Sequence, residues 1–82
     1  MLTVYSKPAC PFCEQTKQYL HSQAVRFEVI DVMEDADALA FIKAQGHRTV
    51  PQIYKDGELF VEGGWTGLSQ IGRHKLLEMI GE

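Results

Sequence analysis

The sequence predicts an α/β fold whose elements follow the order βαβαββα. Three observations support this prediction. Apolar residues switch along the chain between the two-residue period of strands and the 3.6-residue period of helices. A strand, a helix and a second strand open the chain, and such units pair their strands in parallel through a right-handed crossover. Asp56-Gly57 then separates two short apolar runs, which is the strongest short signal for a β-hairpin.

The first strand and the first helix come from the N-terminal part of the chain. The apolar run at residues 2–5 predicts the strand. Pro11 suits the first helical position, because its fixed φ is already helical and its missing N–H needs no partner there. We expect this helix to end near Gln23. Four of its residues fall on one face: Cys13, Thr16, Tyr19 and Leu20.

A second strand and a second helix follow. In residues 25–32, apolar and charged side chains first alternate and the segment then ends in apolar residues, so we expect a mostly buried strand. Asp35 or Asp37 can cap the helix, and Gly46 suits its C-terminal end. The residues expected to face the core are Ala36, Leu39, Ala40 and Ile42, with the stem of Lys43 as an alternative to Ile42.

The last elements are a hairpin and a single third helix. Residues 52–55 and 58–61 flank the Asp56-Gly57 turn and predict two strands. After Gly63-Gly64, apolar residues recur near helical spacing and predict one helix. These residues are Leu68, Ile71, Leu76, Met79 and Ile80.

Composition indicates one small domain over residues 1–82, since 45% hydrophobic residues suffice for one compact core. A formal net charge of −3 and the lack of a basic run exclude nucleic acid as a partner, and no apolar run is long enough for a bilayer. The cysteines form one local motif and no targeting segment is seen. The sequence therefore predicts a cytoplasmic monomer.

Cys10 and Cys13 are separated by two residues, a spacing that suits either an internal disulfide or metal ligation. At the start of a helix, free N–H groups and the helix dipole stabilise an anion, so we predict that Cys10 is the nucleophilic thiolate. Cys13 lies one turn inside and is expected to stay a thiol until it attacks. Zinc needs four ligands, and the three histidines lack ligand spacing, so no metal is expected.

The chain resembles a glutaredoxin of the dithiol type, within the thioredoxin-like superfamily. Three segments support this in order: Lys7-Pro8-Ala9-Cys10-Pro11-Phe12-Cys13, Thr49-Val50-Pro51 and Gly63-Gly64. The resemblance implies a thioredoxin-like (glutaredoxin) fold with a four-stranded mixed sheet of order 2-1-3-4, flanked on both faces by three helices. It also implies a glutathione-dependent oxidoreductase that reduces protein disulfides and glutathione mixed disulfides through Cys10 and Cys13.

The resemblance further implies binding roles for glutathione, as a co-substrate and not a tightly bound cofactor. A cis peptide before Pro51 would let the Val50 backbone pair with that of a substrate cysteine. Lys7 would hold the glycyl carboxylate, and the N–H groups after Gly64 would receive the γ-glutamyl carboxylate. Phe12 would shape the groove. The remaining predicted glutathione-contacting residues are Thr49, Trp65 and Thr66.

One segment departs from the glutaredoxin pattern. Typical glutaredoxins follow the two glycines with a small residue and then Ser-Asp or Asp-Asp, whereas this chain has Trp65-Thr66-Gly67. Thr66 can still cap a helix, but Gly67 offers no carboxylate to the γ-glutamyl ammonium. The segment resembles the Trp-Ser-Gly of glutaredoxin-like redoxins that donate electrons to ribonucleotide reductase and are recharged by thioredoxin reductase.

Two alternatives therefore accompany the glutathione-dependent enzyme. The first is a donor to ribonucleotide reductase that thioredoxin reductase recharges. The second is an iron–sulfur cluster carrier, which Pro11 disfavours because cluster-binding glutaredoxins usually have a small residue at that position. Cys-Pro-Phe-Cys and Thr-Val-Pro belong to the glutathione users, so we expect glutathione to be the reductant. The protein target and the reduction potential stay open.

Overall fold

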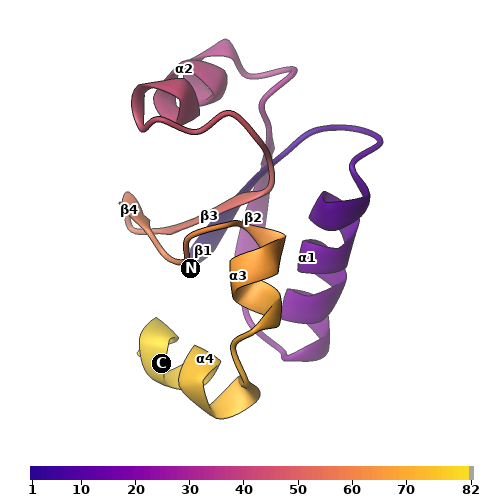
Figure 1. Ribbon diagram of the computed structural model, residues 1–82, viewed down its shortest axis with the longest axis vertical. Helices are drawn as coiled ribbons and strands as arrows, with labels where there is room; N and C mark the ends of the chain where they lie inside the picture. Colours follow the sequence, from indigo (N-terminus) through magenta and orange to yellow (C-terminus); the bar gives the residue numbers. More distant parts are fainter. Residues whose placement is uncertain (82) are drawn as a thin grey trace.

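The strands within the described chain form one mixed sheet of four, in the order β2-β1-β3-β4 (Figure 1). The computed structural model describes residues 1–81. β1 (Leu2–Ser6) pairs in parallel with β2 (Phe27–Asp31) and antiparallel with β3 (Gln52–Lys55). β4 (Glu58–Leu59) pairs antiparallel with β3. The mixed sheet and its strand order are thus confirmed.

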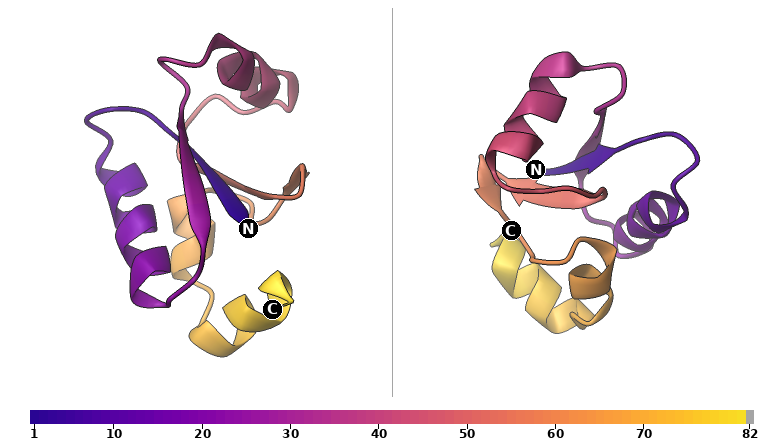
Figure 2. Two further views of the ribbon diagram at one scale, coloured as in Figure 1. Left: turned by 180° about the vertical axis from the view of Figure 1, so that it is seen from behind. Right: turned by 45° about the horizontal axis from the view of Figure 1, so that its top comes forward.

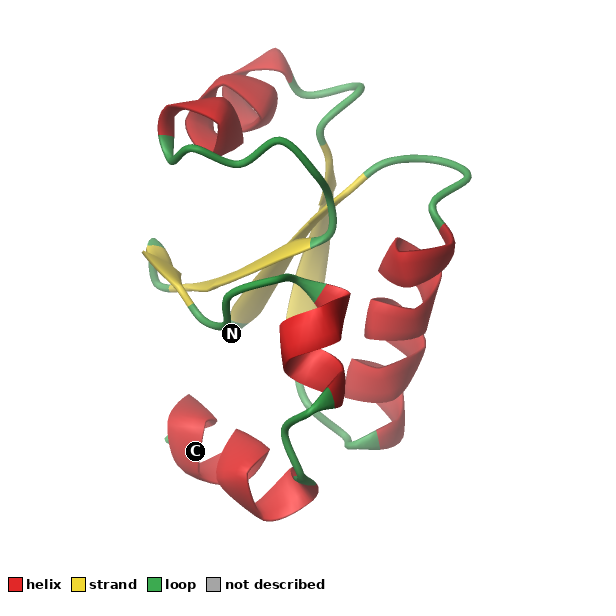
Figure 3. Ribbon diagram, viewed as in Figure 1, coloured by secondary structure: helices red, strands yellow, loops and turns green. Residues whose placement is uncertain are grey.

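Helices cover both faces of this sheet (Figures 1 and 2). α1 (Pro11–Ser22) and α3 (Trp65–Ser69) lie side by side on one face, and α4 (Arg73–Ile80) continues that layer. α2 (Ala36–Ala44) covers the other face. Loops lead into α1, β3 and α3 (Figure 3). The motifs on which the glutaredoxin resemblance rests lie in these three loops and in the first turn of α1.

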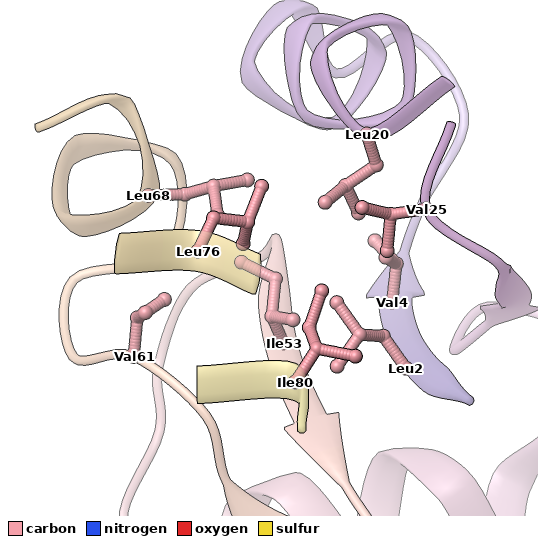
Figure 4. Packing of buried hydrophobic residues seen from close by; sticks show 9 residues of the cluster. All are labelled: Leu2, Val4, Leu20, Val25, Ile53, Val61, Leu68, Leu76 and Ile80. Atoms are coloured by element: carbon pink, nitrogen blue, oxygen red, sulfur yellow. The ribbon is translucent and has the colours of Figure 1, made fainter. Parts of the chain in front are cut away.

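Two apolar clusters hold the layers together, because successive side chains of a strand point to opposite faces. Leu2 and Val4 of β1 face the layer of α1, α3 and α4, whereas Tyr5 packs on the side of α2. The larger cluster comprises Leu2, Val4, Leu20, Val25, Ile53, Val61, Leu68, Leu76 and Ile80 (Figure 4). The smaller one comprises Val32, Ala38 and Ile42, with Tyr5, Ile30, Leu39, Phe41 and Val50 packed against it.

The prediction of three helices is wrong, because residues 1–81 form four. The expected third helix ends at Ser69, and Gly72, in an extended conformation (φ −72°, ψ 163°), is the N-cap of α4. Between the two helices, the Ile71 carbonyl accepts a hydrogen bond from the Tyr19 hydroxyl at 2.8 Å. This bond ties the break to α1, and the apolar spacing continues across it because both helices pack into the same cluster.

Two strands also differ from expectation. β2 covers residues 27–31 and is not mostly buried, since it is an edge strand and Val29 is 44% exposed. β4 ends at Leu59 and not at residue 61, although the Phe60 N–H still donates to the Ile53 carbonyl at 2.9 Å. The turn between β3 and β4 is as predicted, with positive φ at both Asp56 (52°) and Gly57 (84°).

α2 is capped by Asp35, whose carboxylate accepts the Ala38 N–H at 3.0 Å, and Gly46 follows its end with φ 88°, as expected. The buried residues of the helix are Ala38 and Ile42, so the expectation that Ala36 and Ala40 face inward is wrong. The side chains that pack toward the sheet are those of Ala38, Ile42 and, partly, Leu39. None of the helices in residues 1–81 has the length and apolarity to cross a membrane.

Candidate functional site

Cys10 occupies the N-cap position of α1, and Pro11 is the first helical residue, as the sequence predicts. The Cys10 backbone is extended (φ −112°, ψ 102°), and its Sγ accepts the Cys13 N–H at 3.2 Å. N-cap side chains usually present an oxygen to this donor; here a sulfur takes that place. The start of α1 thus offers the Cys10 sulfur an amide donor and the positive end of the helix dipole.

The loop before β3 approaches Cys10 from the other side. The Cys10 thiol donates to the Val50 carbonyl, with Sγ and O 3.8 Å apart, and only 7% of Cys10 is exposed. The Val50–Pro51 peptide bond is cis, as the resemblance implies, and Pro51 is buried. The reacting sulfur therefore lies between the first turn of α1 and the Val50 backbone.

Cys13 is fully buried one turn into α1. Burial raises the pKa of the Cys13 thiol above its ordinary value of 9.0, and contact with Cys10 raises it further. The Ser6 hydroxyl and the Lys7 backbone act in the opposite direction, because hydrogen bonds to a thiolate stabilise it. Both cysteines are free thiols. The arrangement keeps Cys13 protonated at neutral pH, while the Cys10 sulfur accepts one backbone N–H, that of Cys13.

Three predicted glutathione-binding residues meet in one groove beside the thiols. Lys7, from the loop after β1, lines it together with Thr49 and Val50. Lys7 and Thr49 are exposed, and Val50 is half-buried. Phe12 stands at the start of α1, where 54% of its surface is exposed. An exposed ammonium at the edge of such a groove can bind a carboxylate.

Gly64 brings the start of α3 against the same loop. It has φ 56°, and a Cβ at this position would lie 2.2 Å from the Pro51 carbonyl oxygen. Only glycine permits this approach, because any side chain would collide with backbone and strain the positive φ. The three motifs of the resemblance, which are distant in sequence, therefore converge around Cys10.

Two other predicted residues lie differently. The Trp65 ring packs edge-on against Tyr19 of α1, with centroids 5.9 Å apart, and it contributes to the main core. Thr66 is exposed within the first turn of α3. The N-cap of α3 is Gly64, which has no side chain to cap the helix, so the expectation that Thr66 caps it is wrong. Trp65 thus supports the packing of α3 on α1.

Gly67, the position where typical glutaredoxins have an acid, leaves no space for a side chain. A Cβ there would lie 1.9 Å from the Glu62 carbonyl oxygen and 3.0 Å from its carbonyl carbon. The chain before α3 therefore passes directly over Gly67. This contact gives the departure from the glutaredoxin pattern a physical cause.

Two residues near the site were missed by sequence reasoning. Gln52 is 5% exposed, and its Nε2 donates to the Thr49 carbonyl at 2.9 Å, which fixes the loop before β3. Its Oε1 is buried without a partner among residues 1–81. A polar residue directly after Pro51 in an apolar strand could have indicated this role. Ala9 has a left-handed φ of 56° just before Cys10, and no pattern in the sequence indicates it.

Comparisons with known proteins agree with this geometry. Residues 2–60 match the glutaredoxin family. A glutaredoxin of Neisseria meningitidis is 38% identical over 73 residues, which cover 85% of this chain and 82% of that protein. A glutaredoxin-like 8.6 kDa protein of Clostridium pasteurianum is 32% identical over 79 residues, covering 95% and 99%. The hybrid peroxiredoxin hyPrx5 of Haemophilus influenzae is 37% identical over 57 residues, and this chain spans only 24% of it.

Solved structures give the same result. The buckwheat glutaredoxin–glutathione complex superposes with a TM-score of 0.79 at 27% identity, covering 98% of this chain and 76% of the buckwheat chain. The NrdH-redoxin of Escherichia coli, a glutaredoxin-like protein with a thioredoxin-like activity profile, has a TM-score of 0.65 at 30% identity, covering 66% and 71%. The chain thus shares its fold with both kinds of redoxin.

Proposed function

This chain belongs to the glutaredoxin family of thiol oxidoreductases, and we propose that it is a glutathione-dependent thiol–disulfide oxidoreductase in which Cys10 attacks and Cys13 resolves. The observation that supports this most directly is the position of the Cys10 sulfur, between the Cys13 N–H and the Val50 carbonyl. The buried Cys13 thiol lies one helical turn away, within reach of any disulfide formed on Cys10.

In the two-thiol route, the Cys10 thiolate attacks one sulfur of a target disulfide, and the other target sulfur leaves as a thiolate. Cys13 then loses its proton and attacks the Cys10 sulfur, which releases the reduced target. The target gains two electrons, and Cys10 and Cys13 become a disulfide. Two glutathione molecules reduce this disulfide and leave as oxidised glutathione. In the one-thiol route, Cys10 takes glutathione from a glutathionylated protein, and a second glutathione frees it.

The Val50 backbone has a second role in this scheme. Its carbonyl accepts the Cys10 S–H in the reduced protein. A carbonyl oxygen has two lone pairs, so the same oxygen can also accept the backbone N–H of the substrate cysteine, as in an added β-strand. Cys10 and the substrate backbone would therefore meet at one atom.

Glutathione would lie across the thiols in an extended form. Lys7 would receive its glycyl carboxylate on the side of α2, and the N–H groups after Gly64 would receive its γ-glutamyl carboxylate. The positions of Lys7, Val50 and Thr49 around one groove support this orientation. The similar buckwheat protein was solved as a glutathione complex.

A second candidate function has its own supporting observation. Gly67 cannot hold the acid that would pair with the γ-glutamyl ammonium, because the Glu62 carbonyl occupies that space. The similarity to NrdH-redoxin, with its thioredoxin-like activity profile, points the same way. The alternative is an electron donor to ribonucleotide reductase that thioredoxin reductase recharges. Turnover with glutathione and glutathione reductase, compared with turnover with thioredoxin reductase, decides between the two. A cytoplasmic location stays a prediction from the cysteine pattern.

The roles of the two sulfurs are tested by replacing each one. Cys10→Ser should abolish all activity, since no nucleophile remains. Cys13→Ser should keep deglutathionylation and lose the reduction of protein disulfides that need a resolving thiol. Both activities are measured in coupled assays with glutathione and glutathione reductase. Equal loss of both activities in the two variants would show that the assigned roles are wrong.

A further inference from the structure

A groove extends from the thiol site along α2. At the end near Cys10 it is lined by Lys7, Thr49 and Val50, and α2 contributes Leu39 and Ile42 beyond them. Its volume is about 150 Å³, which matches a cavity that holds one benzene ring. The groove is therefore large enough for one bulky apolar side chain. Its other lining residues are Val32, Met33, Lys43, His47 and Arg48.

Met33 lines this groove and is 66% exposed. An unbranched methionine adapts its shape to different partners, and its exposure gives an incoming apolar side chain a surface to cover. His47 is fixed by a hydrogen bond between its Nε2 and the Tyr54 hydroxyl at 2.7 Å. The groove lining thus combines a histidine held by a hydrogen bond with a flexible methionine.

The rim of the groove is positively charged. Lys7, Lys43 and Arg48 are exposed, and none of the residues that line the groove is acidic. The chain as a whole has a formal net charge of −3, so this local excess of cations is opposite in sign to the rest of the protein. Charge complementarity therefore favours an acidic partner here.

We propose that this groove binds the residues that follow the reacting cysteine of a protein substrate: a bulky apolar residue in the groove and acidic residues on its rim. The inference rests on the proposed function, in which Lys7 receives the glycyl end of glutathione. A protein substrate has no carboxylate at that point, because its chain continues past Lys7. The continuation follows the groove along α2, whereas glutathione ends at Lys7, at the near end of the groove. The groove would thus let the enzyme distinguish protein substrates from glutathione.

Peptide disulfides test this without glutathione. Two symmetric disulfide dimers are compared, one of Gly-Cys-Leu-Glu-Glu and one of its reversed sequence, Glu-Glu-Leu-Cys-Gly. The fully reduced protein reduces either dimer in a single turnover, as its two thiols become one disulfide and the dimer becomes two thiols. We expect the first dimer to react about five- to tenfold faster, roughly the gain from partial burial of one leucine side chain in an open groove. Acid quenching and chromatography of the free peptide measure the rate.

Matched variants locate the effect. Lys43→Glu should remove most of the preference for the first peptide, while Lys75→Glu, which reverses an exposed lysine on α4, should preserve it. Met33→Glu should also remove the preference, whereas Leu77→Glu, at another exposed apolar side chain, should not. Because Lys43 and Met33 lie outside the glutathione-binding residues, deglutathionylation rates should stay unchanged in all four variants. Added salt should reduce the parent's preference, as expected for charges on an exposed rim.

Three results would overturn the inference: equal rates for the two dimers, a faster reaction with the reversed peptide, or equal effects of Lys43→Glu and Lys75→Glu. A failure of the proposed function looks different. In that case the parent protein would reduce neither dimer, or it would turn over only with thioredoxin reductase. With thioredoxin reductase as the sole reductant, a peptide preference that survives in single turnover would still support the groove.

Discussion

The two segments that enclose Cys10, residues 49–51 and residues 63–67, are held in place in different ways. The first is fixed by hydrogen bonds, since the Gln52 side chain binds the Thr49 carbonyl at 2.9 Å and the Val50 carbonyl accepts the thiol. The second is fixed by close backbone packing at Gly64 and Gly67. No side chain caps α3 at its start.

This difference predicts how each segment responds to amino-acid substitution. A segment held by hydrogen bonds loses one contact when a side chain changes, and the rest of its geometry persists. A segment held by backbone contact at glycines tolerates no added atom, because the interior has no free volume to receive it. Residues 63–67 should therefore respond to substitution through stability, and residues 49–51 through substrate binding.

The largest effect is expected for Gly64→Ala. The added Cβ would lie 2.2 Å from the Pro51 carbonyl oxygen at a φ of 56°, so collision and backbone strain add together. The free energy of unfolding should fall by at least about 3 kcal/mol, which denaturant titration measures. Gly72→Ala is the control, because a Cβ at Gly72 meets nothing within 4 Å. If both variants are equally stable, the contact between Gly64 and Pro51 is not what holds the two segments together.

A smaller loss of stability is expected for Gly67→Ala. The collision with the Glu62 carbonyl, at 1.9 Å, is partly offset because alanine favours the helix over glycine by about 1 kcal/mol. A net loss of about 1–2 kcal/mol should appear in the same titration. A more stable variant would mean that residue 62 moves aside easily. The position would then be open to the acid of typical glutaredoxins, and the case for the alternative reductant would weaken.

Gln52→Leu should affect function more than stability. The substitution removes the hydrogen bond to the Thr49 carbonyl, but it also removes the buried Oε1 that has no partner in the described chain. These effects oppose each other, so the change in unfolding free energy should stay below about 1 kcal/mol. Protein disulfide reduction should slow a few-fold as Thr49 and Val50 loosen, roughly the value of one hydrogen bond. An exposed control, Gln18→Leu, should show no such slowing.

Lys7→Ala should have the smallest effect. Its kinetics help to decide between glutathione and thioredoxin reductase as the source of electrons. Its ammonium is exposed, so its loss should raise the KM for a glutathionylated peptide by only about two- to fivefold, without changing stability. Steady-state assays with glutathione reductase measure it. Unchanged glutathione kinetics in this variant, together with turnover by thioredoxin reductase, would favour the donor to ribonucleotide reductase. This test needs no substitution at Gly67, where the side chain of a new acid would disturb the fold.

Much of this protein follows from the sequence alone, because the relevant forces act between near neighbours. Pro11 at the first helical position sets Cys10 as the N-cap of α1, and Asp56-Gly57 sets the turn between β3 and β4. The order of the elements also follows from local periodicity up to β4. The glutaredoxin resemblance supplied the strand order and the residues around the thiols.

Other features were decided only by the tertiary structure. The Cys10 thiol meets the Val50 carbonyl across 40 positions of sequence, and Gly67 excludes a side chain because residue 62 crosses it. The break between α3 and α4 is joined to α1 by a hydrogen bond from the Tyr19 hydroxyl. Local sequence patterns indicate the periodicity of apolar residues. They do not indicate which backbone atoms of a distant segment will come into contact. Those approaches are fixed when the helices pack on the sheet, and they determine which atoms surround Cys10.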